Sequence, residues 1–181
     1  ALLIAEGFRK TSSKRNYFFR LALFTLIAQI PFFLAINIAG GFNASLNILF
    51  TFLIGVIALQ GYSILPTYFL KIPCIILCAG LAESVNSDYG AYGIIILFGS
   101  YLYLEGNKYV GLSVLLFTST FSLLFPQFSF AGDLQLFALM AIPLLMSYGG
   151  QKGSYSLPKM FFYWFYPIHL LILFLVWYFI Q

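Results

Sequence analysis

The single histidine of the chain, His169, is the residue best suited to acid–base chemistry. It lies in the apolar segment FFYWFYPIHLLILF, and an imidazole changes its charge near neutral pH, as a general base requires. Pro167 frees a backbone carbonyl about one turn earlier and can kink the helix, which leaves room for a ligand. A neutral imidazole packed against Tyr163 or Tyr166 explains the same pattern without any chemistry. Both interpretations stay open at this point.

Five basic residues gather near the N-terminus: Arg9, Lys10, Lys14, Arg15 and Arg20. Arginine forks suit phosphate, so this segment could bind the phosphates of a nucleotide cofactor. The same residues also serve as an orientation signal and a contact for lipid headgroups, which requires no further function. Arg20 enters an apolar segment, from which a long side chain can extend back to the headgroups.

The acidic residues are few, and two of them are candidates for a site. Glu6 precedes Arg9 and Lys10 by three and four positions, which places the three side chains on one helix face. This spacing fits either a functional carboxylate or an ion pair at the membrane interface. Glu83 and Asp88 are five positions apart, so they form only a weak candidate for a coupled carboxylate pair.

Other polar residues have structural explanations. Cys74 and Cys78 lie in the apolar run CIILC without nearby ligands, so we expect no metal site and treat them as small apolar residues. Gln29, Asn47 and Gln60 are expected to form hydrogen bonds between helices. The chain contains no GxSxG elbow, P-loop, HExxH motif or dinucleotide fingerprint.

The amino-acid composition indicates what kind of helices and connections must position these residues. Charged residues make up 8% of the chain, against about 25% in soluble domains, while apolar types reach 62% and aromatic types 20%. Such a chain uses the lipid bilayer as its solvent. Its positive charge then reports orientation first, and nucleic acid is not an expected partner.

Charges, prolines, glycines and asparagines divide the chain into helices. We predict an all-α, polytopic transmembrane helix bundle, formed by one domain over residues 1–181. The segments are an N-terminal helix fragment, Ala1–Phe8, followed by seven full spans at Tyr17–Ala35, Leu46–Gly61, Ile72–Val85, Tyr92–Leu104, Tyr109–Phe125, Leu134–Tyr148 and Met160–Ile180.

The basic residues give an independent check on this division, because lysine and arginine collect on cytoplasmic connections. Besides the five near the N-terminus, the chain contains Lys71, Lys108, Lys152 and Lys159. All nine fall at the first, third, fifth or seventh connection, whereas the opposite connections contain Asp88 and Asp133. The first connection is therefore expected inside the cell and the C-terminus outside.

The order of these features resembles the TraX family of integral-membrane proteins, named for the acetylase of conjugative pilin. The most specific matches are AEGFR with the basic stretch after it, AQIPF, and FYPIH near the C-terminus. The apolar segments LNILFTFLIGVIAL and DYGAYGIIILF also match, but they are less specific. The family is in turn similar to membrane acyltransferases that modify surface polysaccharides.

This resemblance implies an acetyl-CoA-dependent acetyltransferase of the bacterial cytoplasmic membrane, acting without a metal. The acceptor would be an amine or hydroxyl of an envelope-associated protein, glycan or lipid, such as a pilin N-terminus. The five N-terminal cations would bind the CoA phosphates. His169 and Tyr166 would line the transfer site, and Glu6 and Asp88 would be polar members of the same cavity. Family members carry an Asp-His pair on a helix upstream of AEGFR, and we expect such a helix to be missing from this chain.

Two other functions fit the sequence. A non-catalytic membrane partner could shield or position an envelope or pilus protein, in which case neither His169 nor Arg9 would be needed. A small-solute transporter would require a continuous pathway and paired interrupted helices in two halves, and no such symmetry is visible.

Overall fold

A computed structural model describes residues 1–38, 45–124, 136–148 and 160–180. Within these residues the chain is all-helical, apart from an isolated bridge between Leu46 and Ser87. The eight helices are α1 (Leu2–Lys10), α2 (Lys14–Ile38), α3 (Ile48–Ile64), α4 (Tyr68–Ser84), α5 (Gly90–Leu104), α6 (Lys108–Leu124), α7 (Leu136–Ser147) and α8 (Phe161–Ile180). Each corresponds to one segment that the sequence predicts.

The helices end where local chemistry stops them. Asn47 caps α3 by accepting a hydrogen bond from the backbone N–H of Leu49, and α3 ends immediately before Leu65 and Pro66. Gly106 takes a φ of +103° between α5 and α6, a conformation that side-chain-bearing residues avoid. These short connections force successive helices to run in opposite directions.

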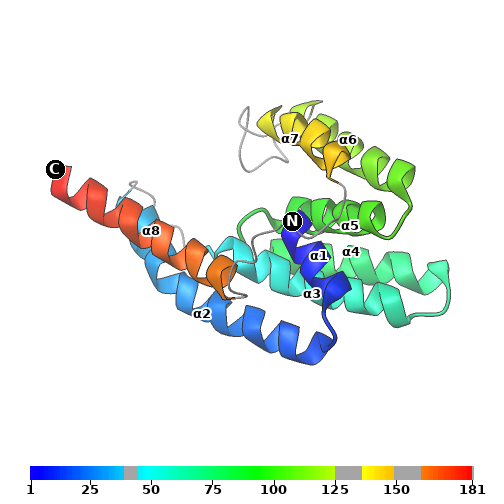
Figure 1. The fold of residues 1–181 in the computed structure, drawn as a ribbon, viewed down its shortest axis with the longest axis horizontal. Helices are drawn as coiled ribbons and strands as arrows, with labels where there is room; N and C mark the ends of the chain where they lie inside the picture. The colour runs from blue at the N-terminus through cyan, green and yellow to red at the C-terminus, as the bar shows by residue number, and fades with distance from the viewer. Residues whose placement is uncertain (39–44, 125–135, 149–159, 181) are drawn as a thin grey trace.

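The bundle has a central layer of α3, α4 and α5, which pack against one another (Figure 1). Helix α1 lies across α3 and α5, while α6 packs on α5 and carries α7 on the same side. Helix α2 packs on α3 and pairs with α8, whose C-terminal part extends away from the other helices. The helices of the central layer run along one approximate axis, so the connections between α3, α4, α5 and α6 alternate between two ends.

We call one end of the bundle the basic end, defined by the connections at residues 11–13, 65–67 and 105–107. Contacts across it join all three connections. The Arg9 guanidinium donates to the carbonyl of Leu104 at the end of α5. The Tyr62 ring, which lies 4.8 Å from the Lys71 ammonium, is 6.2 Å from the Tyr101 ring on α5, measured between ring centres. The predicted grouping of the first, third and fifth connections at one end is therefore present in the fold. Lys152, Lys159 and Asp133 lie outside the described residues.

The opposite, polar end is held by a buried hydrogen-bond network. The Asn47 side chain is fully buried, and its Nδ2 donates to the Thr25 carbonyl at 2.9 Å and to Gln29 Oε1 at 2.8 Å. Thr51 Oγ1 lies 3.0 Å from Ser87 Oγ and also donates to the backbone carbonyl of Asp88. This network joins α2, α3 and the connection between α4 and α5, so the predicted interhelical role of Gln29 and Asn47 is present.

Small residues allow the central helices to approach closely. A Cβ placed at Gly55 would lie 2.3 Å from Leu97, and one at Gly111 would lie 2.5 Å from the backbone nitrogen of Tyr103. The second contact involves backbone that cannot move aside, so α5 and α6 can pack this closely only with glycine at position 111. Small residues at helix interfaces are typical of membrane bundles.

Two helical segments are long and apolar enough to cross a membrane: Lys14–Ile36 within α2, and α8. The central helices contain 15 to 17 residues, or about 22 to 26 Å, and α7 contains 12, against a hydrocarbon core of about 30 Å. The all-helical bundle is thus confirmed, while the number of seven full spans is not.

We expect Asn47→Ala to lower the free energy of unfolding by about 2 kcal/mol, because it removes a helix cap and leaves Gln29 and the Thr25 carbonyl buried without their donor. Unfolding in detergent micelles measures this loss. Asn16→Ala, an exposed asparagine on α2, serves as the control and should change stability by less than about 0.5 kcal/mol. Equal stability of the two variants would contradict the role of Asn47.

Candidate functional site

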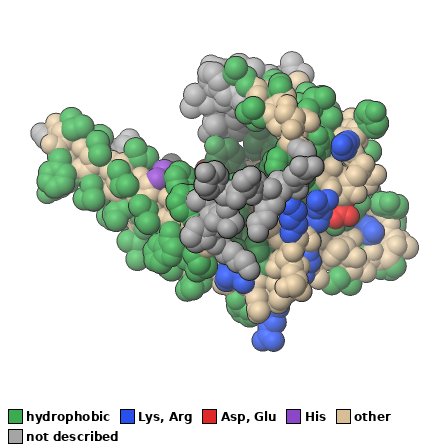
Figure 2. All heavy atoms as spheres, in the orientation of Figure 1, with side chains coloured by type: hydrophobic (Ala, Val, Ile, Leu, Met, Phe, Trp, Pro, Cys, Tyr) green, Lys and Arg blue, Asp and Glu red, His purple; other side chains and the backbone are tan. Residues whose placement is uncertain are grey.

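The basic end gathers four of the five predicted cations around one connection. Helix α1 ends at Lys10 and α2 begins at Lys14, so Arg9, Lys10, Lys14 and Arg15 flank a turn of three residues. Lys14 is fixed there, since its ammonium donates to the carbonyl of Phe8 and lies 4.1 Å from the centre of the Phe8 ring. In Figure 2 the lysine and arginine side chains gather at the lower and right-hand part of the visible face, whereas the free end of α8 is largely hydrophobic.

A cavity of about 610 Å³ opens beside this turn. Lys14 and Arg15 lie at one end of it, and its walls come from α1, α2, α3 and α4. The lining residues are Phe8, Lys14, Arg15, Phe18, Phe19, Val56, Ile57, Gln60, Gly61, Ile64 and Cys74. The Gln60 Oε1 atom is buried without a hydrogen-bond partner among the described residues. The cavity is therefore apolar inside and positively charged at its mouth.

Glu6 is held in a small polar cluster on the other side of α1. Its Oε1 lies 2.5 Å from Lys10 Nζ and accepts a hydrogen bond of 2.5 Å from the Tyr148 hydroxyl. The ion pair with Lys10 has the i, i+4 spacing that the sequence indicates. A carboxylate that is already paired with an ammonium is a weak base, so this geometry favours a structural role.

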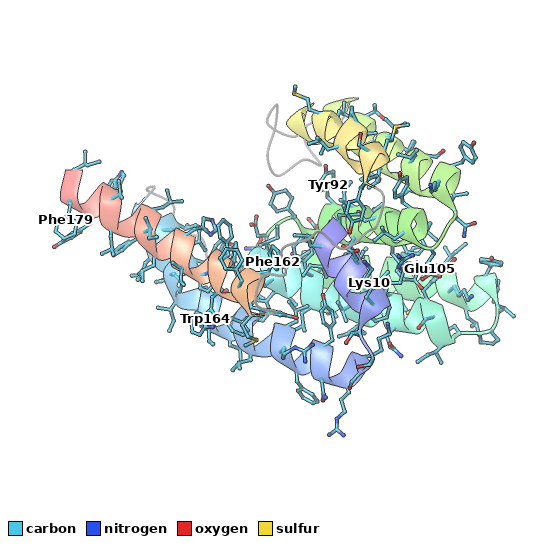
Figure 3. The ribbon with its side chains drawn as sticks, viewed as in Figure 1. Lys10, Tyr92, Glu105, Phe162, Trp164 and Phe179 are labelled. Carbon is cyan, nitrogen blue, oxygen red and sulfur yellow. The ribbon has the colours of Figure 1, made fainter. Side chains whose placement is uncertain are left out.

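Arg20 does not join the cavity. It is exposed on α2, five residues beyond Arg15, and lies within electrostatic reach of the Tyr17 hydroxyl. Its position matches a guanidinium that extends along the surface of the helix. Figure 3 shows Lys10 and Glu105 near the basic end, with Phe179 at the far end of α8.

Asp88 and Tyr166 both lie at the polar end. Tyr166 approaches the backbone of Ile48 and lies within electrostatic reach of Asp88 and Tyr89. Burial raises the pKa of the Asp88 carboxyl, although a hydrogen bond from the Tyr89 backbone N–H partly opposes this shift. A carboxyl group that holds its proton to higher pH is better suited to acid–base exchange near neutrality.

His169 lies one turn beyond Phe165 on α8, and its hydrogen-bond and ring contacts with described residues come from its own helix. Its Nδ1 is 3.1 Å from the Phe165 carbonyl, and its ring stacks on Phe165 with centroids 5.2 Å apart. The Tyr166 ring centre is 5.5 Å from it. The side chain is half-buried and is not among the residues that line the cavity.

The candidate residues thus form two groups instead of one. Helix α5 separates Asp88, which precedes its first residue, from Leu104, which contacts Arg9. Its 15 residues span about 22 Å, so Asp88 and the cations lie at opposite ends of the bundle. Glu6 belongs with the cations, and Asp88 belongs with Tyr166. The described residues therefore do not bring Glu6 and Asp88 into one cavity.

Sequence reasoning missed several residues of these two sites. Tyr148 is hydrogen-bonded to Glu6, 142 positions away in the sequence, and Thr51 is hydrogen-bonded to the Asp88 carbonyl, 37 positions away. No sequence pattern near either residue indicates these pairings. The cavity wall at Val56 and Gly61 also depends on how α3 meets α4. An isolated glutamine in an apolar helix was visible at Gln60, but only the fold places it at a cavity.

We expect the stability of the protein to fall as pH rises above about 3.9, the ordinary pKa of an aspartate, through the higher folded-state pKa of Asp88. The sign follows because the folded state holds this proton more tightly than the unfolded state does. Asp88→Asn should remove this part of the pH dependence. The measurement is the unfolding temperature in detergent between about pH 3 and pH 7. The two proteins should agree at the acidic limit, and parallel curves over the whole range would contradict the assignment.

Comparison with protein families gives one match. The family described as TraX protein matches residues 1–177, nearly the whole chain. Searches of curated proteins and of solved structures give no match. The two membrane-span candidates and the helical bundle agree with the resemblance that AEGFR, AQIPF and FYPIH indicate. The chain belongs to the TraX family.

Proposed function

We propose that this protein is an acetyltransferase that moves an acetyl group from acetyl-CoA to an amine or hydroxyl of an envelope-associated acceptor. The observation that carries the proposal is the gathering of Arg9, Lys10, Lys14 and Arg15 at one end of the bundle, in a chain of the TraX family. Clustered guanidinium and ammonium groups are the groups that bind phosphates. The donor would supply those phosphates.

The orientation follows from the same charges. We place the basic end at the cytoplasmic face of a bacterial inner membrane that the bundle crosses several times, because lysine and arginine collect on that face. The polar end and the C-terminus then face outward. Acetyl-CoA would reach the basic end from the cytoplasm, and Arg20 would lie at the level of the lipid headgroups beside it.

The transfer step needs a base, a reacting carbonyl and a donor for the oxyanion. The base removes the proton of the acceptor as its nitrogen or oxygen attacks the thioester carbon. The carbon–sulfur bond breaks, and the CoA thiolate leaves and takes up a proton. The acceptor gains the acetyl group, so no oxidant, reductant or metal is required.

We assign the base to the polar end, where Asp88 and Tyr166 lie together and His169 follows one turn later on α8. Asp88 is preferred to Glu6 because its carboxyl is not paired with an ammonium of any described residue. The Tyr166 hydroxyl is suited to donate to the oxyanion. This arrangement requires the thioester end of acetyl-CoA to extend about 22 Å along the bundle from phosphates held at the basic end.

A second candidate function is that of a non-catalytic membrane partner of an envelope or pilus protein. It is favoured by α8, whose side chains are mostly exposed, and by the contact of His169 with its own helix. In that case His169→Ala and Arg9→Glu would leave function intact, while Trp177→Ala on the exposed part of α8 would weaken partner binding.

CoA binding tests the donor site. The double substitution Arg9→Ala and Lys10→Ala should weaken CoA binding by the full-length protein at least tenfold, since each charged hydrogen bond contributes about 1.5 to 3 kcal/mol. Titration calorimetry in detergent gives the affinity. Lys108→Ala removes a cation from the start of α6 and should change the affinity by less than about twofold. Failure of the wild-type protein to bind CoA would end the proposal.

Acetyl transfer tests the polar end separately. With labelled acetyl-CoA and bacterial membranes as the acceptor source, Asp88→Asn should lower label transfer by about 10² to 10⁴ while CoA affinity stays unchanged. His169→Ala and Tyr166→Phe should also lower transfer without affecting CoA affinity. Trp177→Ala, on the exposed end of α8, is the matched control. Full transfer by Asp88→Asn would exclude this residue as the base.

A further inference from the structure

The apolar cavity beside the α1–α2 turn has the size and lining of a binding site for a small molecule. It is bounded by eleven residues, of which only Lys14, Arg15 and Gln60 are polar. Its volume of about 610 Å³ falls in the range of pockets that take up small molecules, about 300 to 1,000 Å³. Its occupant must therefore be mainly apolar and must carry a negative charge at one end.

The cavity opens toward the surface that a membrane would cover. Phe19, Ile57 and Ile64 line it and are themselves 56%, 47% and 69% exposed. Exposed apolar side chains continue on α4, where Phe69, Ile72 and Ile76 are 85%, 54% and 64% exposed. A molecule can therefore enter from the hydrocarbon phase between these side chains without passing through water.

The dimensions match one leaflet of a bilayer. The lining residues of α3 lie between Val56 and Ile64, a stretch that rises about 12 Å along the helix. Half of the hydrocarbon core is about 15 Å thick. Ile64 ends α3 at the basic end, where Lys14 and Arg15 lie, so the charged mouth and the apolar depth follow the order of a phospholipid headgroup and its chain.

The cations at the mouth are placed to meet a phosphate. The Lys14 ammonium donates to the carbonyls of Phe8 and Arg9, which leaves one of its three N–H donors for a ligand. Arg15 contacts the Phe19 ring at 5.7 Å and has no hydrogen bond or ion pair with another described residue. Basic pockets between membrane helices on the cytoplasmic side bind anionic lipid headgroups.

A lipid fits this cavity better than the linear arm of CoA does. That arm contains amide groups, each of which loses free energy when it is buried without a hydrogen-bond partner. Among the lining residues beyond the charged mouth, only Gln60 offers a polar side chain. An acyl chain has no polar groups that need hydrogen-bond partners. At its ester end, rotation of the Gln60 amide can present the NH₂ group to the ester carbonyl.

We propose that this cavity binds one acyl chain of an anionic phospholipid, whose phosphate lies between Lys14 and Arg15. The lipid phosphate would use two of the four cations at the proposed donor site. It leaves Arg9 and Lys10 as the cations for the CoA phosphates, and it ties the start of α2 to α3 and α4 on the cytoplasmic side of the membrane.

The test compares lipids that share the same chains. The full-length protein in detergent is titrated with phosphatidylglycerol and with phosphatidylcholine, and bound lipid is counted by native mass spectrometry. Phosphatidylglycerol should bind at least about fivefold more tightly. Arg15→Ala should remove that preference, and Lys108→Ala should retain it.

A second pair of variants tests the cavity itself. Ile57→Trp places a larger side chain into the cavity from an exposed position and should lower phosphatidylglycerol binding at least about fivefold. Ile76→Trp makes the same change on α4 outside the lining and should leave binding unchanged. Retention of wild-type binding by Ile57→Trp would overturn the proposal even if the charge effect is present.

Two further probes separate the sources of phosphate. Inorganic phosphate should not displace phosphatidylglycerol at equal concentration, because it has no chain to fill the cavity. Displacement of the lipid by inorganic phosphate would assign the cavity to a soluble phosphate ligand and overturn the lipid proposal. Displacement by CoA would do the same if Ile57→Trp abolishes it. No acceptor or acetyl transfer is involved in these assays, so their outcome is independent of the catalytic proposal.

Discussion

The cost of placing charge in hydrocarbon is the constraint on which this architecture depends. An ionised side chain at the centre of a bilayer costs at least about 2.5 to 3.5 kcal/mol, so charged residues must collect at the ends of the helices. Six of the nine basic residues lie at the basic end, on α1, α2, α4 and α6. Because the connections are short, helices of alternating direction bring these distant residues together. One electrostatic requirement thereby organises both the topology and the most distinctive surface of the protein.

The interior is held together by other means. Glycines at positions 55 and 111 allow helix backbones to approach closely, and the fully buried Asn47 joins α2 to α3. A buried amide needs all its partners, and Asn47 obtains them from Thr25, Gln29 and Leu49. This satisfied network contrasts with Gln60, whose oxygen is buried at a cavity wall without such a partner in the part of the chain that the structure describes. The contrast distinguishes a polar group that stabilises the bundle from one that is available to a ligand.

The two polar regions have different chemistry. The basic end offers permanent charges and an apolar cavity, which suit an anionic ligand, whereas the polar end offers a half-buried carboxyl and a tyrosine hydroxyl. About 22 Å of helix α5 separates them. Such a division fits a protein that takes up one ligand at one membrane face and acts on another at the opposite face. It also explains why Glu6 and Asp88, which have the same chemistry, have different surroundings.

The sequence by itself determined the helical class, the position of each of the eight described helices to within a few residues, and the TraX family. These follow from local properties, namely apolar run length, capping residues and motifs such as AEGFR and FYPIH. It also predicted which connections share an end, because charge alternates along the chain. Only the tertiary structure decided that Asp88 approaches Tyr166, that Glu6 meets Tyr148, and that a cavity lies beside Lys14 and Arg15. These contacts depend on the rotation and offset of packed helices, and apolar surfaces that are uniform around a helix leave no periodic signal from which rotation could be predicted.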